Sequence, residues 1–252
     1  MNVVRFRRYE CKYVIDEGQA DLVRRAVLPF VQPDPYAAGR PDTSYGIESL
    51  YLDAPDLLLF RETEEGHTQR LKLRIRDYTD GPTDTGVFLE IKRKYVRLVL
   101  KDRAAVSRLV ASRLVAGVAT LVDGLSPREL ACHDEFVAWV ARWRAQPVVW
   151  VRYTREAYVG IYNEGLRITF DRNLRCSAGD SLAIPDDAAW YLCDPGSVVL
   201  ELKFNAHYPD WLRRVVRRFG LRQRSYSKYG NAVRFGLRRY RLVPSAQSQL
   251  TC

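Results

Sequence analysis

The sequence predicts an α+β domain built on an antiparallel sheet. Several segments alternate apolar and polar residues with the period of two that is typical of half-buried strands. Other segments, lying between them, have helical periodicity. Two turn-rich sequences each lie between a pair of predicted strands and indicate hairpins. No boundary-like linker or internal repeat divides the 252 residues, so we expect a single domain over residues 1–252.

The first four elements alternate between strand and helix patterns. Residues 1–15 alternate like a strand, and residues 16–31 form an amphipathic helical pattern with acidic residues in its first turn. After a proline-rich loop, residues 45–53 (YGIESLYLD) predict a second strand. Residues 54–66 predict a short helix that Asp56 could cap and that its last glycine could end.

The middle of the chain predicts a hairpin followed by a helical insert. Residues 70–78 (RLKLRIRDY) and 86–96 (GVFLEIKRKYV) are strand patterns separated by the turn-rich sequence TDGPTDTG. Residues 104 to about 145 are helical in pattern. Within them, LSPREL places Ser126 at an N-cap, with proline at the first helical position and glutamate at the third.

The last third predicts three more strands and a helix. Strand patterns cover residues 147–162, 166–171 and 197–204, and the first two are joined across the short sequence NEG. Residues 208–219 are helix-like, and the sequence SYSKYGNAVRFGL follows at 225–237.

The composition is strongly basic. Forty lysines and arginines against thirty aspartates and glutamates give a formal net charge of +10 and a pI near 9.5. This balance favours nucleic acid, phospholipid surfaces or phosphorylated small molecules as partners and does not choose among them. The five cysteines are scattered and form no CxxC pair, so we interpret them as reduced thiols of a cytoplasmic protein. No signal-peptide pattern or long apolar run predicts export or a transmembrane helix.

Several predicted strands carry charged residues on one face. In residues 70–78, Lys72, Arg74 and Arg76 alternate with leucine and isoleucine. Because successive side chains of a strand point to opposite faces, one face is cationic and the other aliphatic. The same pattern recurs in four groups: Arg8 with Glu10 and Lys12, Glu90 with Lys92 and Lys94, Arg167 with Thr169, and Glu201 with Lys203.

Two interpretations of these faces remain open. A two-layer sheet with its polar face in water would expose such residues. However, cations stacked on one face repel one another, and the cost grows as the face is removed from water unless an anion lies among them. If the strands close into a barrel, the charged faces line a channel, and that channel would bind a polyanion.

The glutamates on these faces are candidate metal ligands. Phosphate chains usually carry a divalent cation, and carboxylates with phosphate oxygens and water suit Mg²⁺ or Mn²⁺. The candidates are Glu201, Glu10 and Glu90. For Glu10 and Glu90, a salt bridge to a lysine on the same face is an equally good interpretation.

Other chemistries have little support in the sequence. It contains no GxxxxGK[ST] phosphate loop, no GxGxxG after a strand and no GxSxG nucleophile elbow. His67, His133 and His207 lack the spacing of metal ligands. Basic strands with interleaved tyrosines could bind RNA, but there is no RNP-like aromatic pair and most aromatic residues fall on the apolar faces. We therefore expect no specific nucleic-acid partner.

Nine short segments, in this order, resemble the VTC domain, the polyphosphate polymerase module of the vacuolar transporter chaperone complex, within the triphosphate tunnel metalloenzyme and CYTH group. They are RRYECKY, SLYLDAPDLLLF, KLRIRDY, VFLEIKRK, VLKDR, PVVWVRYTREAY, LRITFD, VLELKF and SYSKYGNA, and they span nearly the whole chain. The resemblance implies an eight-stranded antiparallel β tunnel barrel with surrounding helices, whose basic lumen holds a triphosphate or polyphosphate.

The resemblance also implies roles for individual residues. Those implied to act in phosphoryl transfer are Arg74, Arg76, Lys92, Arg155, Arg167 and Lys228. Those expected to bind phosphate are Lys12, Lys101, Tyr153 and Ser227, with Lys203 added because it shares the face of Glu201. Glu201 resembles the family's metal-binding glutamate, and Glu10 and Glu90 are the alternatives.

The first strand departs from the wider tunnel superfamily, in which it begins with ExExK. This chain has Arg8, Glu10 and Lys12 at these positions. With one carboxylate fewer, a metal would be held more by the substrate than by the protein. Hydrolytic relatives generally use more glutamates, so the change favours transfer over hydrolysis.

Together these observations predict a metal-dependent polyphosphate polymerase, an ATP:polyphosphate phosphotransferase that uses Mn²⁺ or Mg²⁺. A terminal oxygen of a phosphate chain would attack the γ-phosphorus of ATP in line, while cations align and neutralise the two polyanions. A metal-dependent tripolyphosphatase or nucleoside triphosphatase and a non-catalytic polyphosphate-binding module remain alternatives. The expected partners are ATP and polyphosphate or tripolyphosphate, and another chain could supply a membrane-protein partner.

Overall fold

The structure is a computed structural model of the chain. It describes residues 8–40, 42–79, 86–96, 98–118, 122–163, 165–184, 187–205 and 208–240. The turn expected between the strands at 70–78 and 86–96 lies largely outside the described residues, as do His207 and Cys252. The other four cysteines are free thiols, in agreement with the expectation.

Ten strands pair in the order β1-β10-β8-β7-β3-β4-β5-β6, with β2 paired to β7 and β9 paired to β8. They are β1 (Arg8–Asp16), β2 (Val31–Pro33), β3 (Ser44–Asp53), β4 (Gln69–Asp77), β5 (Val87–Tyr95), β6 (Leu98–Val106), β7 (Gln146–Gly160), β8 (Arg167–Ala178), β9 (Tyr191–Leu192) and β10 (Ser197–Asn205). Antiparallel ladders join β1 to β10, β10 to β8, and β3 through β6 in turn, which confirms the predicted α+β class. Over the described residues the pairing order is open, with β1 and β6 at its ends, so closure into an eight-stranded barrel is not confirmed.

Six α-helices accompany the strands in the described part of the chain: α1 (Glu17–Val27), α2 (Leu58–Glu64), α3 (Arg108–Val115), α4 (Pro127–Trp143), α5 (Asp210–Arg218) and α6 (Lys228–Phe235). A 3₁₀ turn (Leu28–Phe30) follows α1, and a π-helical turn (Gly236–Tyr240) follows α6. Asp16 caps α1, because its carboxylate accepts the backbone N–H of Gln19 at 2.7 Å. Of the helices in the described ranges, none has the length and apolar character that crossing a membrane would need.

The chain divides into two compact units. Unit 1 contains Met1–Gly46, Tyr153–Leu174 and Asp194–Tyr226, and unit 2 contains Ile47–Arg152, Arg175–Cys193 and Ser227–Cys252. Strands β3, β7 and β8 contribute residues to both units. Each unit has its own buried apolar cluster. The expected single domain over residues 1–252 stays a prediction.

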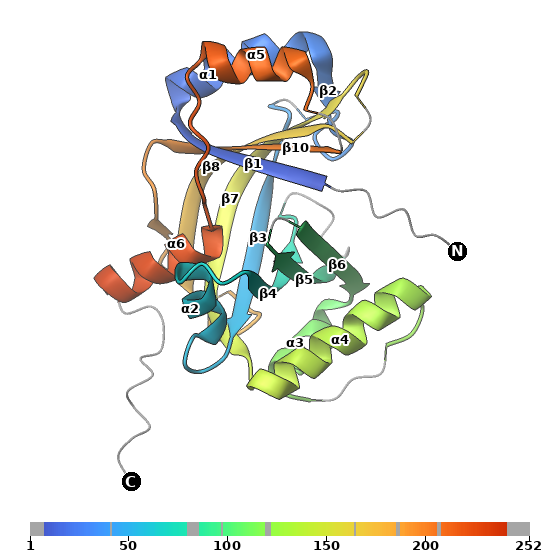
Figure 1. The fold of residues 1–252 in the computed structure, drawn as a ribbon. Helices are drawn as coiled ribbons and strands as arrows, with labels where there is room; N and C mark the ends of the chain where they lie inside the picture. The colour runs from blue at the N-terminus through green and yellow to red at the C-terminus, as the bar shows by residue number, and fades with distance from the viewer. Residues whose placement is uncertain are drawn as a thin grey trace. The chain divides into compact units, whose positions relative to one another are not determined.

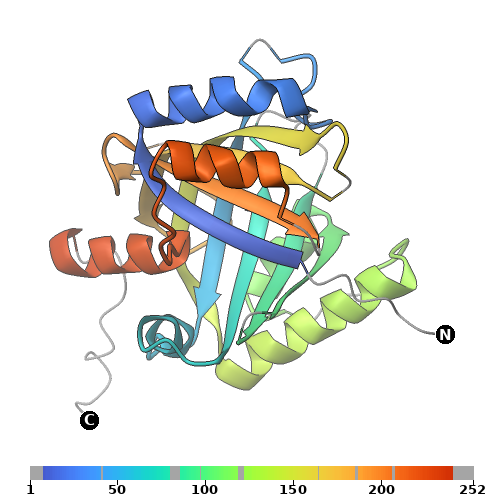
Figure 2. The same ribbon diagram turned by 45° about the horizontal axis from the view of Figure 1, so that its top comes forward.

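In unit 1, the apolar face of β1, β10 and β8 packs against α1 and α5. Leu200 of β10 and Ile168 of β8 are completely buried. Val23 of α1 and Leu212 and Val215 of α5 belong to the same cluster. Figures 1 and 2 show the two helices side by side. One face of these strands is thus covered, and the alternation of side chains leaves their charged residues on the other face.

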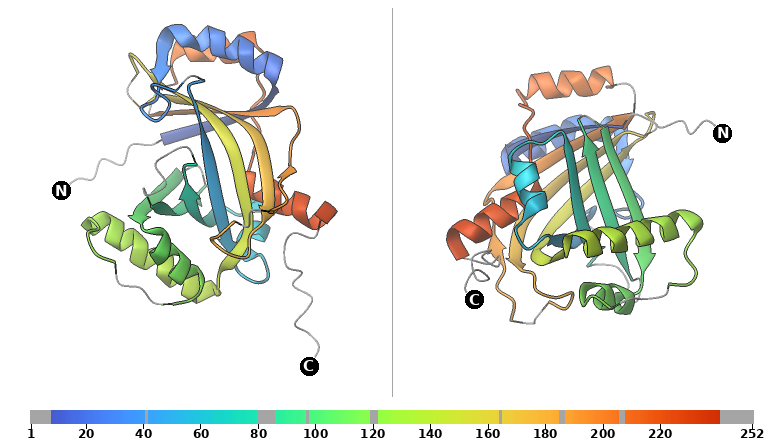
Figure 3. Two further views of the ribbon diagram at one scale, coloured as in Figure 1. Left: turned by 180° about the vertical axis from the view of Figure 1, so that it is seen from behind. Right: turned by 60° about the horizontal axis from the view of Figure 1, so that its bottom comes forward.

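In unit 2, the apolar face of β3 to β6 packs against α3 and α4. Leu73 and Ile75 of β4, Leu89 of β5 and Phe136 of α4 are each at most 1% exposed. This confirms the predicted apolar phase of RLKLRIRDY. Figure 3 shows α4 crossing the strands on one side. The cationic phase therefore points to the side away from α4.

The start of α2 differs from the expectation that Asp56 caps it. Leu57 precedes the helix with a left-handed φ of 57°, and its own side chain makes no capping hydrogen bond. Asp56 instead forms an ion pair with an arginine of α2 at 2.5 Å. The capping role passes to Asp53 at the end of β3, whose carboxylate accepts the backbone N–H groups of Leu59 and Phe60 at 2.8 and 2.9 Å. The carboxylate that accepts these N–H groups therefore comes from the last residue of β3, which lies next to the first turn of α2.

The helical insert begins later than predicted. Residues 104–106 belong to strand β6, and the first helix starts at Arg108. The strand pattern is obscured because Lys101, Asp102 and Arg103 place charges on both faces in succession. Further along, the cap of α4 is confirmed: the Ser126 side chain and Glu129 form a reciprocal capping box, with proline at the first helical position.

Candidate functional site

In unit 2, the charged side chains that alternate with apolar ones along β4, β5 and β6 lie on one face of these strands. The register pairs Lys72 with Lys92 and Lys92 with Lys101, so three lysines form a row across the three strands. In the next row, Arg74 of β4 lies opposite Glu90 of β5. The predicted cations of this region are therefore brought together on one face, and they are Lys72, Arg74, Arg76, Lys92 and Lys101.

A fully buried carboxylate, Glu90, organises this face. Its Oε2 accepts a hydrogen bond from Arg74 Nε at 2.6 Å, and its Oε1 lies 2.5 Å from Lys101 Nζ. Arg76 Nε is 3.7 Å from Oε2. Burial alone would raise the pKa of Glu90, but these three cations hold the pKa well below its usual range. Each of these contacts is to a cation, which fits the salt-bridge interpretation of Glu90 rather than metal ligation.

The ammonium group of Lys101 is held less firmly in its charged form. Burial is the main cause that lowers the pKa of Lys101 to about 7; attraction to Glu90 opposes this shift, and repulsion from Arg76 and Arg74 adds to it. The side chain of Lys101 is nevertheless 38% exposed, so a dissolved anion can reach it. An anion bound beside this group would favour the charged lysine.

Two hydroxyl groups of β3 orient the arginines. Arg74 Nη1 donates to Tyr51 OH at 2.9 Å, and Arg76 Nε donates to Ser49 Oγ at 3.4 Å. The register places these residues directly opposite each other. Arg76 is only 4% exposed, so this is not an ordinary solvated sheet face. Neither hydroxyl was predicted, although Ser49 and Tyr51 repeat with a period of two in YGIESLYLD and could have been found by that signal.

The start of α6 lies beside the lysine row. Ser227 caps the helix, because its Oγ accepts a backbone N–H of the first turn at 2.9 Å, and the same Oγ accepts from Lys72 Nζ at 2.6 Å. Lys228, the first residue of the helix, is 8% exposed. The next residue, Tyr229, donates its hydroxyl to Asp53 at 2.5 Å in the interior. Buried contacts thus fix residues 227–229, the SKY of SYSKYGNA, within unit 2.

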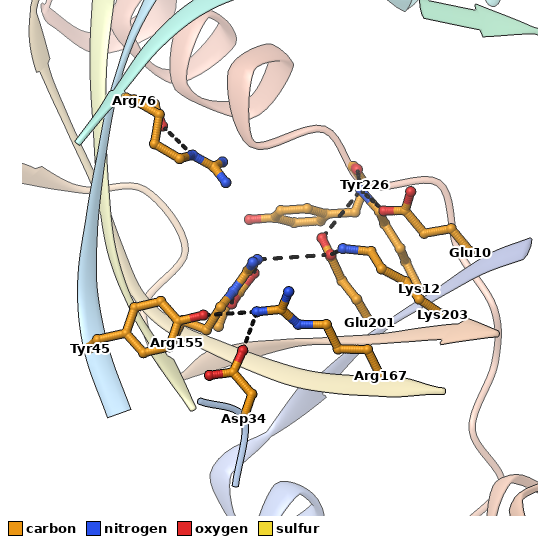
Figure 4. Close-up of polar contacts among 12 residues, drawn as sticks. Glu10, Lys12, Asp34, Tyr45, Arg76, Arg155, Arg167, Glu201, Lys203 and Tyr226 are labelled. Carbon is orange, nitrogen blue, oxygen red and sulfur yellow. Dashed lines mark hydrogen bonds and ion pairs between the residues drawn. The ribbon is translucent and has the colours of Figure 1, made fainter. Parts of the chain in front are cut away.

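In unit 1, a second charged cluster is centred on Glu201 (Figure 4). Its Oε2 accepts from Lys203 Nζ at 2.7 Å, and its Oε1 lies 3.4 Å from Lys12 Nζ. Lys12 Nζ is also 3.4 Å from Glu10 and donates to the backbone oxygen of Tyr226 at 3.0 Å. The register of β1 and β10 produces this alternation, because Lys12 lies opposite Glu201 and Glu10 lies opposite Lys203.

Carboxylates also fix the two predicted arginines of unit 1. Arg155 donates to both oxygens of Asp171 at 2.6 and 2.7 Å. Arg167 Nη2 donates to Asp34 Oδ2 at 2.5 Å and to Tyr45 OH at 3.0 Å (Figure 4). None of these three partners was predicted. Asp171 continues the period of two that begins at Arg167 and was detectable, whereas the aspartate in the proline-rich loop has no such signal.

Tyr153 lies beneath Arg155. The guanidinium carbon is 5.4 Å from the centre of the tyrosine ring, and the ring is 3% exposed. The predicted pair is therefore brought together, with the aromatic ring supporting the guanidinium plane.

Glu201 and Glu10 are the carboxylates of unit 1 that could hold a divalent cation. Across the described ranges, no group of three or more His, Cys, Asp or Glu side chains is arranged to hold a metal. Lys12 lies between the two glutamates, and Arg155 Nη2 is 3.9 Å from Glu201. A cation here would have to displace Lys12 and take most of its oxygen ligands from a bound phosphate. The donor set fits a metal that arrives with its substrate rather than one held by protein alone.

Both clusters consist of guanidinium, ammonium and hydroxyl donors in orientations set by neighbouring side chains. Such donors bind phosphate oxygens through charge-assisted hydrogen bonds, and arginine can do so with two parallel bonds. Donors that are oriented before the ligand arrives also stabilise charge that develops during phosphoryl transfer. Each cluster can therefore bind a polyanion and neutralise its charge.

Comparison of the sequence with known families identifies the family of the chain. The family model of the VTC domain matches residues 7–236. No match was found among curated proteins. A solved structure of the PH1819 protein from Pyrococcus horikoshii OT3 is similar, with a TM-score of 0.44 and 17% sequence identity, covering 87% of this chain and 95% of that chain. Because the family model spans most of the sequence, the chain belongs to the VTC domain family.

Proposed function

We propose that the chain is a polyphosphate polymerase that transfers the γ-phosphate of ATP to a growing polyphosphate chain, with Mn²⁺ or Mg²⁺ as cofactor. The VTC domain family is linked to polyphosphate synthesis in general. A terminal oxygen of the phosphate chain forms the new bond to the γ-phosphorus as the bond to the β-phosphate oxygen breaks. ADP leaves and the chain is longer by one phosphate, so no protein nucleophile takes part.

The observation that carries this proposal is the cationic face of β4, β5 and β6. Its five predicted cations share the face with a single carboxylate, Glu90, within the described residues of these strands. Because this carboxylate is already ion-paired, an excess of positive charge remains on side chains that are partly removed from water. A phosphate chain supplies closely spaced negative charges that offset this excess, whereas a single phosphate contacts only part of the face.

Different residues have different parts in this proposal. Arg74 and Arg76 hold the phosphate oxygens around the reacting phosphorus, because Glu90 and the β3 hydroxyl groups orient their guanidinium planes in advance. The lysine row neutralises the remaining phosphates. Three further groups are proposed to bind phosphate: Lys228 with Ser227 at the start of α6, Arg155 and Arg167, and Lys12 with Lys203.

The divalent cation is proposed to bind Glu201 together with phosphate oxygens, and Glu10 is the alternative ligand. When bound, it would neutralise phosphate charge and orient the triphosphate. Glu90 is not part of this proposal, because its carboxylate is occupied by Arg74 and Lys101.

The test is to incubate the purified chain with ATP and Mn²⁺ and to separate the products by length. We expect ADP and phosphate chains that lengthen with time, and neither product from an Arg74→Ala/Arg76→Ala variant. Free phosphate as the main product would replace the proposal by a triphosphatase. Binding of polyphosphate without turnover of ATP would replace it by a binding module.

A further inference from the structure

Helix α5 and the segment after it carry an outward-facing set of cations in unit 1. Because helical residues advance by about 100° each, the four arginines of α5 fall within an arc of about 140°. The opposite side of the helix is buried through Leu212 and Val215. We call the exposed set the α5 arginine surface, and its members are Arg213, Arg214, Arg217, Arg218, Arg222 and Arg224.

This surface has little negative charge to balance it. Arg213 lies 3.2 Å from Asp210, and no ion pair joins the other five arginines to a carboxylate in the described ranges. Like charges that recur every four residues along a helix repel one another. On the neighbouring helix α1, by contrast, Glu17, Asp21 and Arg24 each take part in an ion pair, such as Arg24 with Glu156 at 3.1 Å, and Arg25 is the one further arginine. The excess of positive charge is therefore largest on α5 and its continuation.

The segment after α5 leads from this surface to the Glu201 cluster. Its Gln223 pairs with Tyr13 of β1, and the backbone N–H of Arg224 donates to the carbonyl oxygen of Lys12 at 2.9 Å. Two residues later, the carbonyl oxygen of Tyr226 accepts from Lys12 Nζ at 3.0 Å. Figure 1 shows this segment passing β1 after it leaves α5. The arginines therefore start on the helix-covered side of the strands, and the segment that carries the last of them passes β1, where the backbone of Arg224 meets that of Lys12, whose side chain contacts Glu201 on the opposite face.

We propose that the α5 arginine surface binds the part of a long polyphosphate chain that extends beyond the Glu201 cluster. The identity of this ligand rests on the proposed function. A flexible polymer with regularly repeated negative charges fits a series of exposed guanidinium groups. Within described residues 208–226, no large apolar or aromatic side chain is exposed. The surface therefore lacks the ring on which a nucleobase would stack and the apolar anchor that would enter a membrane.

The proposal predicts a dependence on chain length. Because α5 and the Glu201 cluster lie on opposite faces of the same strands, we expect the three phosphates of tripolyphosphate to occupy only one of them, whereas a long chain can occupy both. Once one part of the chain is bound, contact of the next part with α5 is an intramolecular step, so several weak contacts add to the affinity. Loss of these contacts should weaken binding of the long chain alone.

The test compares two variants with equal loss of charge. The test variant is Arg214→Gln/Arg217→Gln/Arg218→Gln on α5, and the control is Arg113→Gln/Arg128→Gln/Arg142→Gln on the exposed sides of α3 and α4 in unit 2. Dissociation constants for long-chain polyphosphate and for tripolyphosphate are measured at several salt concentrations, after melting temperatures have shown that both variants are folded.

For the test variant, we expect about tenfold weaker binding of the long chain. We also expect a salt dependence of the logarithm of the affinity that is shallower by about two, by analogy with single-stranded nucleic acid. Affinity for tripolyphosphate should not change, and the control variant should match the unaltered chain with both ligands. Equal losses for both ligands, equal losses in both variants, or no loss would each overturn the proposal. Single-stranded DNA that competes as well as polyphosphate at equal phosphate concentration would also overturn it.

These measurements contain no ATP and so are independent of turnover. If the chain makes no polyphosphate but the test variant loses long-chain binding as expected, the proposed role of the α5 arginine surface is supported and the proposed polymerase function is wrong. If the chain is a polymerase and long-chain binding is unchanged in the test variant, the polymerase function is supported and the proposed role of the α5 arginine surface is wrong.

Discussion

The two charged clusters differ in the balance of their charges. In unit 1, four predicted cations each contact a carboxylate: Lys12 and Lys203 contact Glu201, Arg155 contacts Asp171, and Arg167 contacts Asp34. In unit 2, three cations, Arg74, Arg76 and Lys101, each contact the same carboxylate, Glu90. Unit 1 is an alternating network, whereas unit 2 has one buried anion that serves several cations.

This difference indicates different ligand requirements. An alternating network satisfies its charges internally, and its carboxylates can also receive a metal. A face on which several cations share one carboxylate should gain more from a bound anion. Phosphate ligands should therefore change the stability of unit 2 more than that of unit 1, and metal effects should depend on unit 1.

The largest effect on activity is expected from replacing Arg76 in the unit 2 cluster. Arg76→Ala removes an oriented donor from a site that is largely shielded from water, so we expect turnover of ATP to fall at least about 100-fold. The melting temperature should stay close to that of the unaltered chain. Arg113→Ala, an exposed arginine of α3, is the matched control and should remain active. An active Arg76→Ala enzyme would show that this face does not bind the reacting phosphates.

Removing one carboxylate from each cluster sharpens the comparison directly. Glu90→Gln leaves three cations without their shared anion, and we expect the free energy of unfolding to fall by about 3 kcal/mol. Tripolyphosphate should restore most of the lost melting temperature, because it binds only the folded chain and replaces the missing charge. Orthophosphate at equal ionic strength should restore little.

The corresponding variant of unit 1 is Asp171→Asn, which leaves Arg155 without its bidentate partner. Tripolyphosphate should restore less of its melting temperature than in Glu90→Gln, since other carboxylates remain nearby. The two clusters do not differ as described if tripolyphosphate restores the melting temperatures of the two variants equally, or if tripolyphosphate and orthophosphate restore them to the same extent.

We expect the dependence of activity on the divalent cation to be set by the carboxylates of unit 1. Glu201→Gln keeps the shape of the side chain and removes its charge, so we expect activity to fall by about 10- to 100-fold. Added Mn²⁺ should rescue it poorly, as seen by titrating the metal in the activity assay. Glu10→Gln is the paired control and should retain more activity. If Glu201→Gln shows the metal dependence of the unaltered chain, the ligand is Glu10 instead.

The smallest expected effect is a dependence of tripolyphosphate binding on pH. The pKa of Lys101 lies at about 7 in the folded chain and at its ordinary value of 10.5 in the unfolded chain. Between these values the unfolded state carries more protons, so this lysine costs stability below pH 7 and the cost is lost as pH rises through the window.

A bound anion favours the protonated lysine, so binding takes up a proton in this window. Affinity for tripolyphosphate should therefore fall as pH rises, by at most about tenfold per pH unit. Lys101→Arg keeps the positive charge at all these pH values and should show a flatter profile in calorimetric titrations. Identical profiles for the two proteins would assign the pH dependence to another group.

Much of the fold was predictable because side-chain direction within a strand is a local property. The alternation in RLKLRIRDY was sufficient to separate Leu73 and Ile75, which are buried, from Arg74 and Arg76 on the opposite face. The cap at Ser126 was predictable for the same reason, because its hydrogen bonds join residues three positions apart. Resemblance to the family extended these patterns to positions such as Lys101, where the local pattern was obscured.

Partners that come from distant segments were not predictable in this way. Asp53 takes the role expected of Asp56 at the start of α2, and it is held there by the hydroxyl of Tyr229, which is 176 residues away in the sequence. The interpretation of Glu90 as a salt-bridge residue also depended on seeing which cations surround it.

The sequence by itself determined which residues are charged, which face of each strand they occupy, and the family to which they belong. Only the tertiary structure decided which cation meets which carboxylate. Arg74 and Glu90 are 16 residues apart, and Arg167 and Asp34 are 133 residues apart. The physical reason is that periodicity constrains one strand at a time, whereas the partner of a side chain depends on the alignment of strands and loops that are distant along the chain.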